Sequence, residues 1–143
     1  MKAINYIIIL IFFTIFSCNE NKEDSNSMIG EWILTSIQEK SSNQLIFYPD
    51  SIPRYESITF VDSTSILLFN GICNQGQGKY IISDNSLIFP EGIGITKILC
   101  KYVIWEEYLY SNLIESSNYY FKNNQLIIQT TGSYNLIFKK KTN

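Results

Sequence analysis

The segment that decides the fold class is 119-YYFKNNQLIIQTTGSYNLIFKKK-141. Apolar runs lie on both sides of Asn123 and Asn124 in this segment, at residues 119–121 and 125–130. Asparagine tolerates the left-handed backbone that a tight hairpin needs. We therefore predict an antiparallel hairpin here.

Alternation in the next run, residues 134–139, places Tyr134, Leu136 and Phe138 on one face of a strand, and the closing lysines keep its end in water. Upstream, short runs of Ile, Leu, Phe and Tyr are separated by Asn, Ser, Asp and Gly, which is typical of successive strands. A second Asx turn at Asp84 and Asn85 predicts another antiparallel hairpin. The candidate strands are residues 31–37, 57–61, 65–70, 79–83, 86–90, 119–121, 125–130 and 134–139.

Residues 101–115 break this two-residue period. Tyr102, Trp105, Leu109 and Leu113 follow one another at spacings of three and four, which predicts one amphipathic helix packed on the sheet. The cluster 116–118 ends it, and residues 39–54, which include two prolines, are expected to form a long loop. The expected fold is mainly β (α+β), a single compact antiparallel sheet or barrel with one helix.

The N-terminus reads as an export signal. Residues 1–17 carry one positive charge, Lys2, and an apolar stretch of about 13 residues, shorter than the roughly 20 that span a bilayer. The segment 15-IFSC-18 resembles a lipobox, so we expect cleavage before Cys18 and acylation of this cysteine. The alternative is an ordinary secretory signal that leaves Cys18 as a free thiol.

These features divide the chain into a signal peptide (1–17), an acylated Cys18 with a flexible acidic tether (18–28) and a β-rich domain (29–143). The expected location is the cell envelope, with a lipid anchor in the outer membrane. The tether is similar to export signals of surface-displayed lipoproteins, yet an acidic linker is also simply well solvated. The periplasmic face and the cell surface therefore both remain open.

Composition restricts the chemistry. The chain has 143 residues, no histidine and a net charge of -2. Nucleic acid is thus a poor partner, and histidine-dependent catalysis and histidine-ligated metals are excluded. We expect no cofactor, no metal site and no catalytic residue.

The three cysteines suggest different fates. Lipidation of Cys18 leaves Cys73 and Cys100, 27 positions apart, to form a structural disulfide in an oxidising compartment. A free-thiol or metal pair is the alternative. A redox role is disfavoured because there is no Cys-x-x-Cys motif.

Several other residues are candidates for a functional role. Glu106 and Glu107 are adjacent on the predicted helix and cannot converge on one bond; we expect Glu106 to be partly buried and bonded internally, and Glu107 to face solvent. The glycines at 76, 78, 92 and 94 are expected in turns. Phe47, Tyr48 and Tyr55, in or beside the proline-bearing loop, are candidates for recognition.

The order of motifs from Gly30 onward resembles the META domain family, the HslJ-like group of small envelope proteins. In the family's "GCN" the glycine directly precedes the cysteine, whereas Ile72 intervenes here. The resemblance implies a compact, mostly antiparallel β-domain with one helix and no established enzyme activity. The residues that carry it are Gly30, Trp32, Gly71, Ile72, Cys73, Asn74, Gly78, Lys79, Tyr80, residues 96–100 including Thr96 and Cys100, Glu106, Leu113, Tyr120, Leu126 and Phe138.

We therefore expect a non-catalytic envelope lipoprotein that binds or stabilises another envelope component. The alternative is a lipocalin-like carrier of a small hydrophobic ligand, because that group also opens with Gly-x-Trp and closes a barrel around its ligand. An enzyme that uses only carboxylates is the least favoured reading, since no facing pair is evident.

Overall fold

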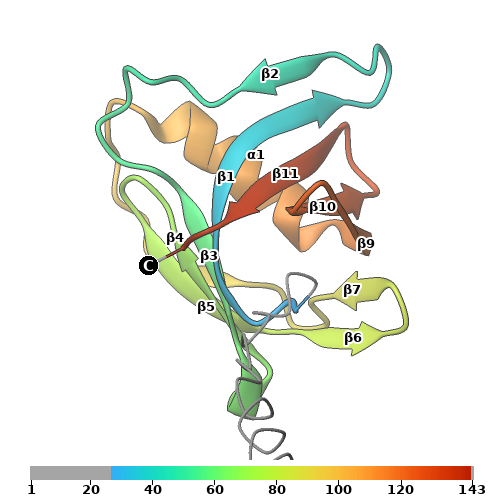
Figure 1. The fold of residues 1–143 in the computed structure, drawn as a ribbon. Helices are drawn as coiled ribbons and strands as arrows, with labels where there is room; N and C mark the ends of the chain where they lie inside the picture. The colour runs from blue at the N-terminus through green and yellow to red at the C-terminus, as the bar shows by residue number, and fades with distance from the viewer. Residues whose placement is uncertain (1–26, 143) are drawn as a thin grey trace, which may run out of the picture.

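The computed structural model describes residues 27–142, which form one curled antiparallel sheet with a single helix packed on it (Figure 1). The predicted signal peptide, Cys18 and most of the predicted tether lie outside the described residues. No helix within the described part is long and apolar enough to cross a membrane.

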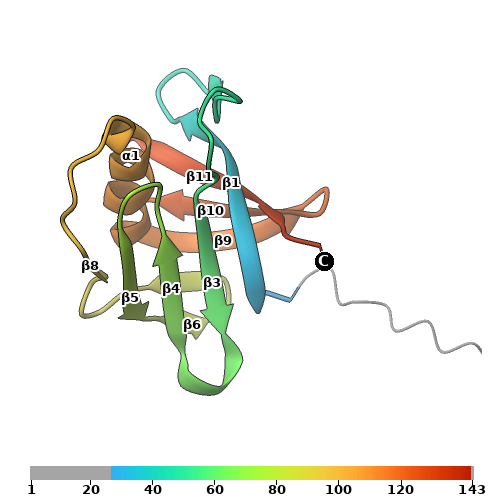
Figure 2. The same ribbon diagram turned by 90° about the vertical axis from the view of Figure 1, so that its left-hand side faces the viewer.

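Ten strands follow one another across the sheet in the order β6-β7-β9-β10-β11-β1-β3-β4-β5-β8, and β2 pairs with β1. The sheet curls into a half-barrel, and α1 packs against β10 and β11 (Figure 2). The elements are β1 (Gly30–Glu39), β2 (Leu45–Phe47), β3 (Ser57–Val61), η1 (Asp62–Thr64), β4 (Ile66–Asn70), β5 (Gln75–Lys79), β6 (Ile81–Ser83), β7 (Ser86–Ile88), β8 (Gly94–Ile95), α1 (Val103–Ile114), β9 (Ser116–Lys122), β10 (Gln125–Thr130) and β11 (Tyr134–Lys140).

Both predicted hairpins are confirmed. Strands β9 and β10 pair antiparallel around Asn123 and Asn124, whose φ angles are 51° and 59°. Strands β6 and β7 pair around Asp84, at φ 52°. The left-handed backbone at these positions is the conformation that Asx residues tolerate best.

The core fills the space between the sheet and the helix. Alternate positions of β1 and β11 point inward, so that Trp32, Leu34, Leu136 and Phe138 are almost completely buried. The helix adds Leu109, which is fully buried. Aromatic and branched side chains from both layers therefore share one hydrophobic core.

The expected strand at residues 79–83 is wrong as a single element. Lys79 ends β5, and the buried Tyr80 separates it from β6. The backbone N–H of Tyr80 donates to the carbonyl of Ser65 at 2.9 Å, after which the chain leaves β4 and pairs with β7. Side chains alternate with the same two-residue period before and after a strand changes its pairing partner. The sequence pattern therefore cannot predict such a change.

The expected turns at Gly76 and Gly78 are also wrong, because both residues lie inside β5. A Cβ at Gly76 would lie 2.2 Å from the carbonyl oxygen of Gly94, so glycine permits close approach of the neighbouring backbone. Gly94 lies in β8, which we did not predict, and Gly92 keeps a turn-like φ of 72°.

The long loop and the helix start differ in smaller ways. The expected loop at residues 39–54 contains β2, three residues paired with β1. The helix begins at Val103 rather than at residue 101, and β9 begins at Ser116 directly after the helix. Helix termini are the least precise feature of a periodicity argument.

Candidate functional site

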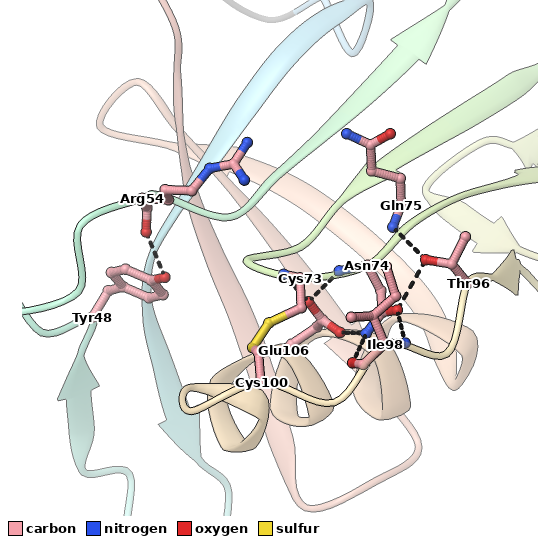
Figure 3. Close-up of a disulfide and its surroundings, with 9 residues drawn as sticks. All are labelled: Tyr48, Arg54, Cys73, Asn74, Gln75, Thr96, Ile98, Cys100 and Glu106. Carbon is pink, nitrogen blue, oxygen red and sulfur yellow. Dashed lines mark hydrogen bonds between the residues drawn. A yellow bond between two sulfur atoms is a disulfide. The ribbon is translucent and has the colours of Figure 1, made fainter.

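The site with the most internal bonding joins the loop 71–74 to the first turns of α1 through Glu106 (Figure 3). The Glu106 side chain is only 3% exposed, and its Oε2 accepts the backbone N–H groups of Cys73 and Asn74 at 2.8 and 2.9 Å. Its Oε1 accepts the side-chain amide of Asn74. One buried carboxylate therefore satisfies three donors of the loop.

Asn74 extends this network to the segment that follows β8. Its Oδ1 accepts the hydroxyl of Thr96 at 2.9 Å and the backbone N–H of Ile98 at 2.6 Å. Its amide nitrogen also donates to the Ile98 carbonyl at 3.1 Å. The Asn74 side chain, which is 4% exposed, therefore links loop 71–74 to residues 96–98 and, through Glu106, to α1.

Gly71 is required by close packing against this network. A Cβ at this position would lie 2.3 Å from Glu106 Oε2. The backbone N–H of Gly71 donates to the Asn74 carbonyl at 2.8 Å, which closes the turn. Ile72, between the glycine and the cysteine, is accommodated by burying its side chain, which is 8% exposed.

The structure joins Cys73 and Cys100 in a disulfide, with a Cα–Cα distance of 6.2 Å. The bond links loop 71–74 to the residues just before α1, where Glu106 already holds the same loop. The disulfide and the carboxylate therefore stabilise one shared junction.

We expect a Cys73→Ser, Cys100→Ser double variant to lose about 3 kcal/mol of unfolding free energy, because the closed loop no longer restricts the unfolded chain. Urea denaturation of both proteins measures the difference. The control is the wild-type protein with reductant, which should fall to the same stability; an unchanged midpoint in both would contradict a stabilising disulfide.

The motif residues fall into two groups. Gly71, Cys73, Asn74, Thr96, Cys100 and Glu106 meet at the junction described above. The others lie elsewhere: Gly30 with φ 114°, Trp32 with its Nε1–H on the Met28 carbonyl at 2.7 Å, Gly78 in β5, and the buried Tyr80 and Leu113. The residues of this second group stabilise the sheet and the core.

The aromatic candidates for recognition have unequal surroundings. Phe47 and Tyr55 are 68% and 48% exposed. Tyr48 is half-buried, packs edge-on against Trp105 at 5.1 Å, and donates its hydroxyl to the Arg54 carbonyl at 2.9 Å. Recognition stays a prediction for all three residues, and Tyr48 in addition holds the loop against α1.

Sequence reasoning missed Glu56, a fully buried carboxyl group just before β3. Among the described residues, neither of its side-chain oxygens has a hydrogen-bond partner. Burial, and secondly the charge of Glu106, raise the pKa of Glu56 to about 8. Burial and the same two glutamates also raise the pKa of the Tyr48 phenol. Nothing in the local sequence distinguishes Glu56 from a surface glutamate.

The buried carboxyl groups of this region are held within the domain. The acceptor oxygens of Glu106 face donors of the domain itself, and Glu56 is enclosed away from solvent. Glu107, the neighbour of Glu106, is exposed. Within residues 27–142, no three His, Cys, Asp or Glu side chains come together as a metal site.

Comparison with known families agrees with these motifs. Residues 26–143 match the model of the META domain. The chain belongs to the META domain family. Loop 71–74, Glu106 and both disulfide cysteines lie within the matched residues. No curated protein matches the chain.

Two solved structures share the fold. A protein from Burkholderia xenovorans, determined by NMR, is 19% identical over 80% of this chain and 83% of its own, with a TM-score of 0.60. A crystallised DUF4847 family protein from Bacteroides vulgatus is 14% identical over 80% of this chain and 94% of its own, with a TM-score of 0.55. At such identities the likeness describes the fold alone.

Proposed function

We propose that this protein is a lipid-anchored envelope protein whose META domain acts as a non-catalytic binding or stabilising module. The anchor is Cys18, attached to the outer membrane, and the tether holds the domain at the periplasmic face or the cell surface. No cofactor takes part.

The observation that carries the non-catalytic part is the engagement of Glu106. A general acid or base must exchange protons with a substrate, yet this carboxylate is 3% exposed and accepts three hydrogen bonds from Cys73 and Asn74. The same bonds make the junction rigid, which suits a module that presents a fixed surface to a partner.

A lipocalin-like carrier of a small hydrophobic ligand remains the alternative. A carrier needs an interior space, whereas Trp32, Phe60, Phe69 and Phe138 occupy the concave side of this half-barrel and are at most 1% exposed. The space of a ligand is therefore largely taken by side chains, which favours binding at the outer surface.

A Cys18→Ser substitution tests the anchor. We expect intact mass measurement of wild-type protein extracted from membranes to show acyl chains on Cys18, and the variant to lack this mass and the membrane retention that it gives. A Ser17→Ala chain, which keeps the cysteine, is the control. Wild-type protein without acyl mass would refute the lipoprotein part of the proposal.

Turnover assays test the non-catalytic part. Purified protein should not transform envelope-derived peptides, glycans or lipids at a rate that depends on one side chain. Activity that a single substitution abolishes without unfolding the domain would overturn this part, and native mass spectrometry that finds a bound lipid would instead favour the carrier.

A further inference from the structure

The loop between β8 and α1 exposes an unusual amount of apolar surface. Leu99 is 91% exposed, Ile104 is 62% exposed and Ile98 is 57% exposed. We call these three residues, with the cleft beside them, the Leu99 face. A protruding leucine that touches almost nothing of its own chain is a typical anchor for a protein contact.

A shallow cleft of about 330 Å³ adjoins Leu99 on the same surface. Apolar side chains make up most of its wall, with Ile95 on the sheet side, Val103 and Tyr110 on the helix side, and Ile98 and Leu99 themselves along the loop. The volume can accept a leucine side chain. The Leu99 face thus carries both a protruding apolar group and a hollow that fits such a group.

The face is held rigid. The disulfide at Cys100 fixes the residue after Leu99, and Asn74 bonds both backbone groups of Ile98, the residue before it. A preorganised loop loses little conformational entropy when it binds. The hydrogen-bond network at Glu106 and Asn74 therefore also positions Leu99.

Charges of both signs border the face. Lys97 and Lys101 are exposed on the loop, and Glu107 is exposed at the helical wall of the cleft. A face that carries an apolar knob, a hollow and charges of both signs offers a second copy of the chain a matching group for each of its own, which is what a twofold interface requires.

The position of the face, together with the proposed anchor at Cys18 on which this step rests, argues against the membrane as its occupant. In Figure 2 the described chain begins at the right, beside the C-terminus, whereas the loop lies at the left with α1. Positions 18 to 27 span at most about 30 Å when fully extended. A domain of this size is about 35 Å across, so the tether favours orientations that turn the Leu99 face away from the lipid.

We propose that two copies of this chain associate through the Leu99 face, with Leu99 of each copy inserted into the cleft of the other. Lys97 or Lys101 of one copy then meets Glu107 of the other at the rim. The interface is isologous, so it closes at a dimer.

Sedimentation analysis of residues 18–143 carrying Cys18→Ser, which keeps every described residue, tests this between about 1 and 200 µM. We expect a monomer–dimer equilibrium, and a dissociation constant raised about tenfold or more by Leu99→Asp, since a buried leucine anchor is lost. Leu99 is solvent-exposed, so this variant should keep the wild-type melting temperature.

Ile81→Asp, at an apolar residue in β6 that is 50% exposed, is the matched control and should leave the dimer unchanged. Lys97→Glu combined with Lys101→Glu should weaken association, and adding Glu107→Lys should restore part of it. A protein that is monomeric throughout this range, or a Leu99→Asp variant that dimerises like wild type, would overturn the proposal. Binding of the monomer to phosphatidylglycerol vesicles through Leu99 would assign the face to lipid and overturn it equally.

Discussion

Replacing Glu106 with alanine is expected to destabilise the META domain by about 4 kcal/mol. The substitution leaves two backbone N–H groups and the Asn74 amide without their buried acceptor, and it opens a small cavity beside Gly71. Urea denaturation with the disulfide intact measures the loss. Near-wild-type stability would mean that the network contributes little.

Glu107→Ala is the matched control for this experiment. The two glutamates are neighbours in α1, but Glu107 is exposed, so its removal should change stability by no more than about 0.5 kcal/mol. Glu106→Gln should fall between the two, because a glutamine oxygen can accept from the backbone while its amide opposes that of Asn74. This ordering separates the buried acceptor from a general effect of charge.

Glu56→Gln is expected to have the second large effect, and one that depends on pH. The pKa of Glu56 is raised from 4.5 to about 8 in the folded protein. At pH 4 both folded and unfolded chains carry the proton, so the ionisation does not affect stability. Between pH 4.5 and 8 the unfolded chain releases the proton while the folded chain retains it, and stability falls as pH rises.

Glutamine has no ionisable proton, so the stability of the variant relative to the wild type should increase as pH rises. The difference in unfolding free energy should grow by about 4.5 kcal/mol from pH 4 to pH 9, at 1.36 kcal/mol per unit of pKa shift. Denaturation at a series of pH values for both proteins yields this difference, in which the other titrating groups largely cancel. Glu107→Gln should show a flat difference, and a flat difference for Glu56→Gln would show that Glu56 ionises normally in the fold.

The two glutamates illustrate the limits of sequence reasoning at this site. Helical periodicity placed Glu106 on the inner side of α1, so its burial and internal bonding were predictable. Its partners were not, because Cys73 and Asn74 are more than 30 residues away. Glu56 gave no signal, since its burial depends on Tyr48 and on α1 closing over the start of β3.

The exposure of Ile98 and Leu99 was missed for a related reason. Ile98 and Leu99 read as part of a family motif, and in sequence an exposed leucine looks the same as a buried one. Their exposure arises because Cys100 and Asn74 hold the backbone of the loop on both sides, away from the core. The family resemblance therefore located the segment but not its surface.

Four features were predictable from the amino-acid sequence alone: the mainly antiparallel class, the hairpins at Asn123 and Asp84, the single helix and the META family. The first three depend on contacts between near neighbours, such as side-chain alternation and the backbone preferences of Asx residues. The order of the strands, the glycine contacts inside β5, the buried Glu56 and the exposed Leu99 face became evident only in the folded domain. Those depend on residues distant in the chain meeting in space, where packing and solvent exclusion, rather than local preference, set the free energy.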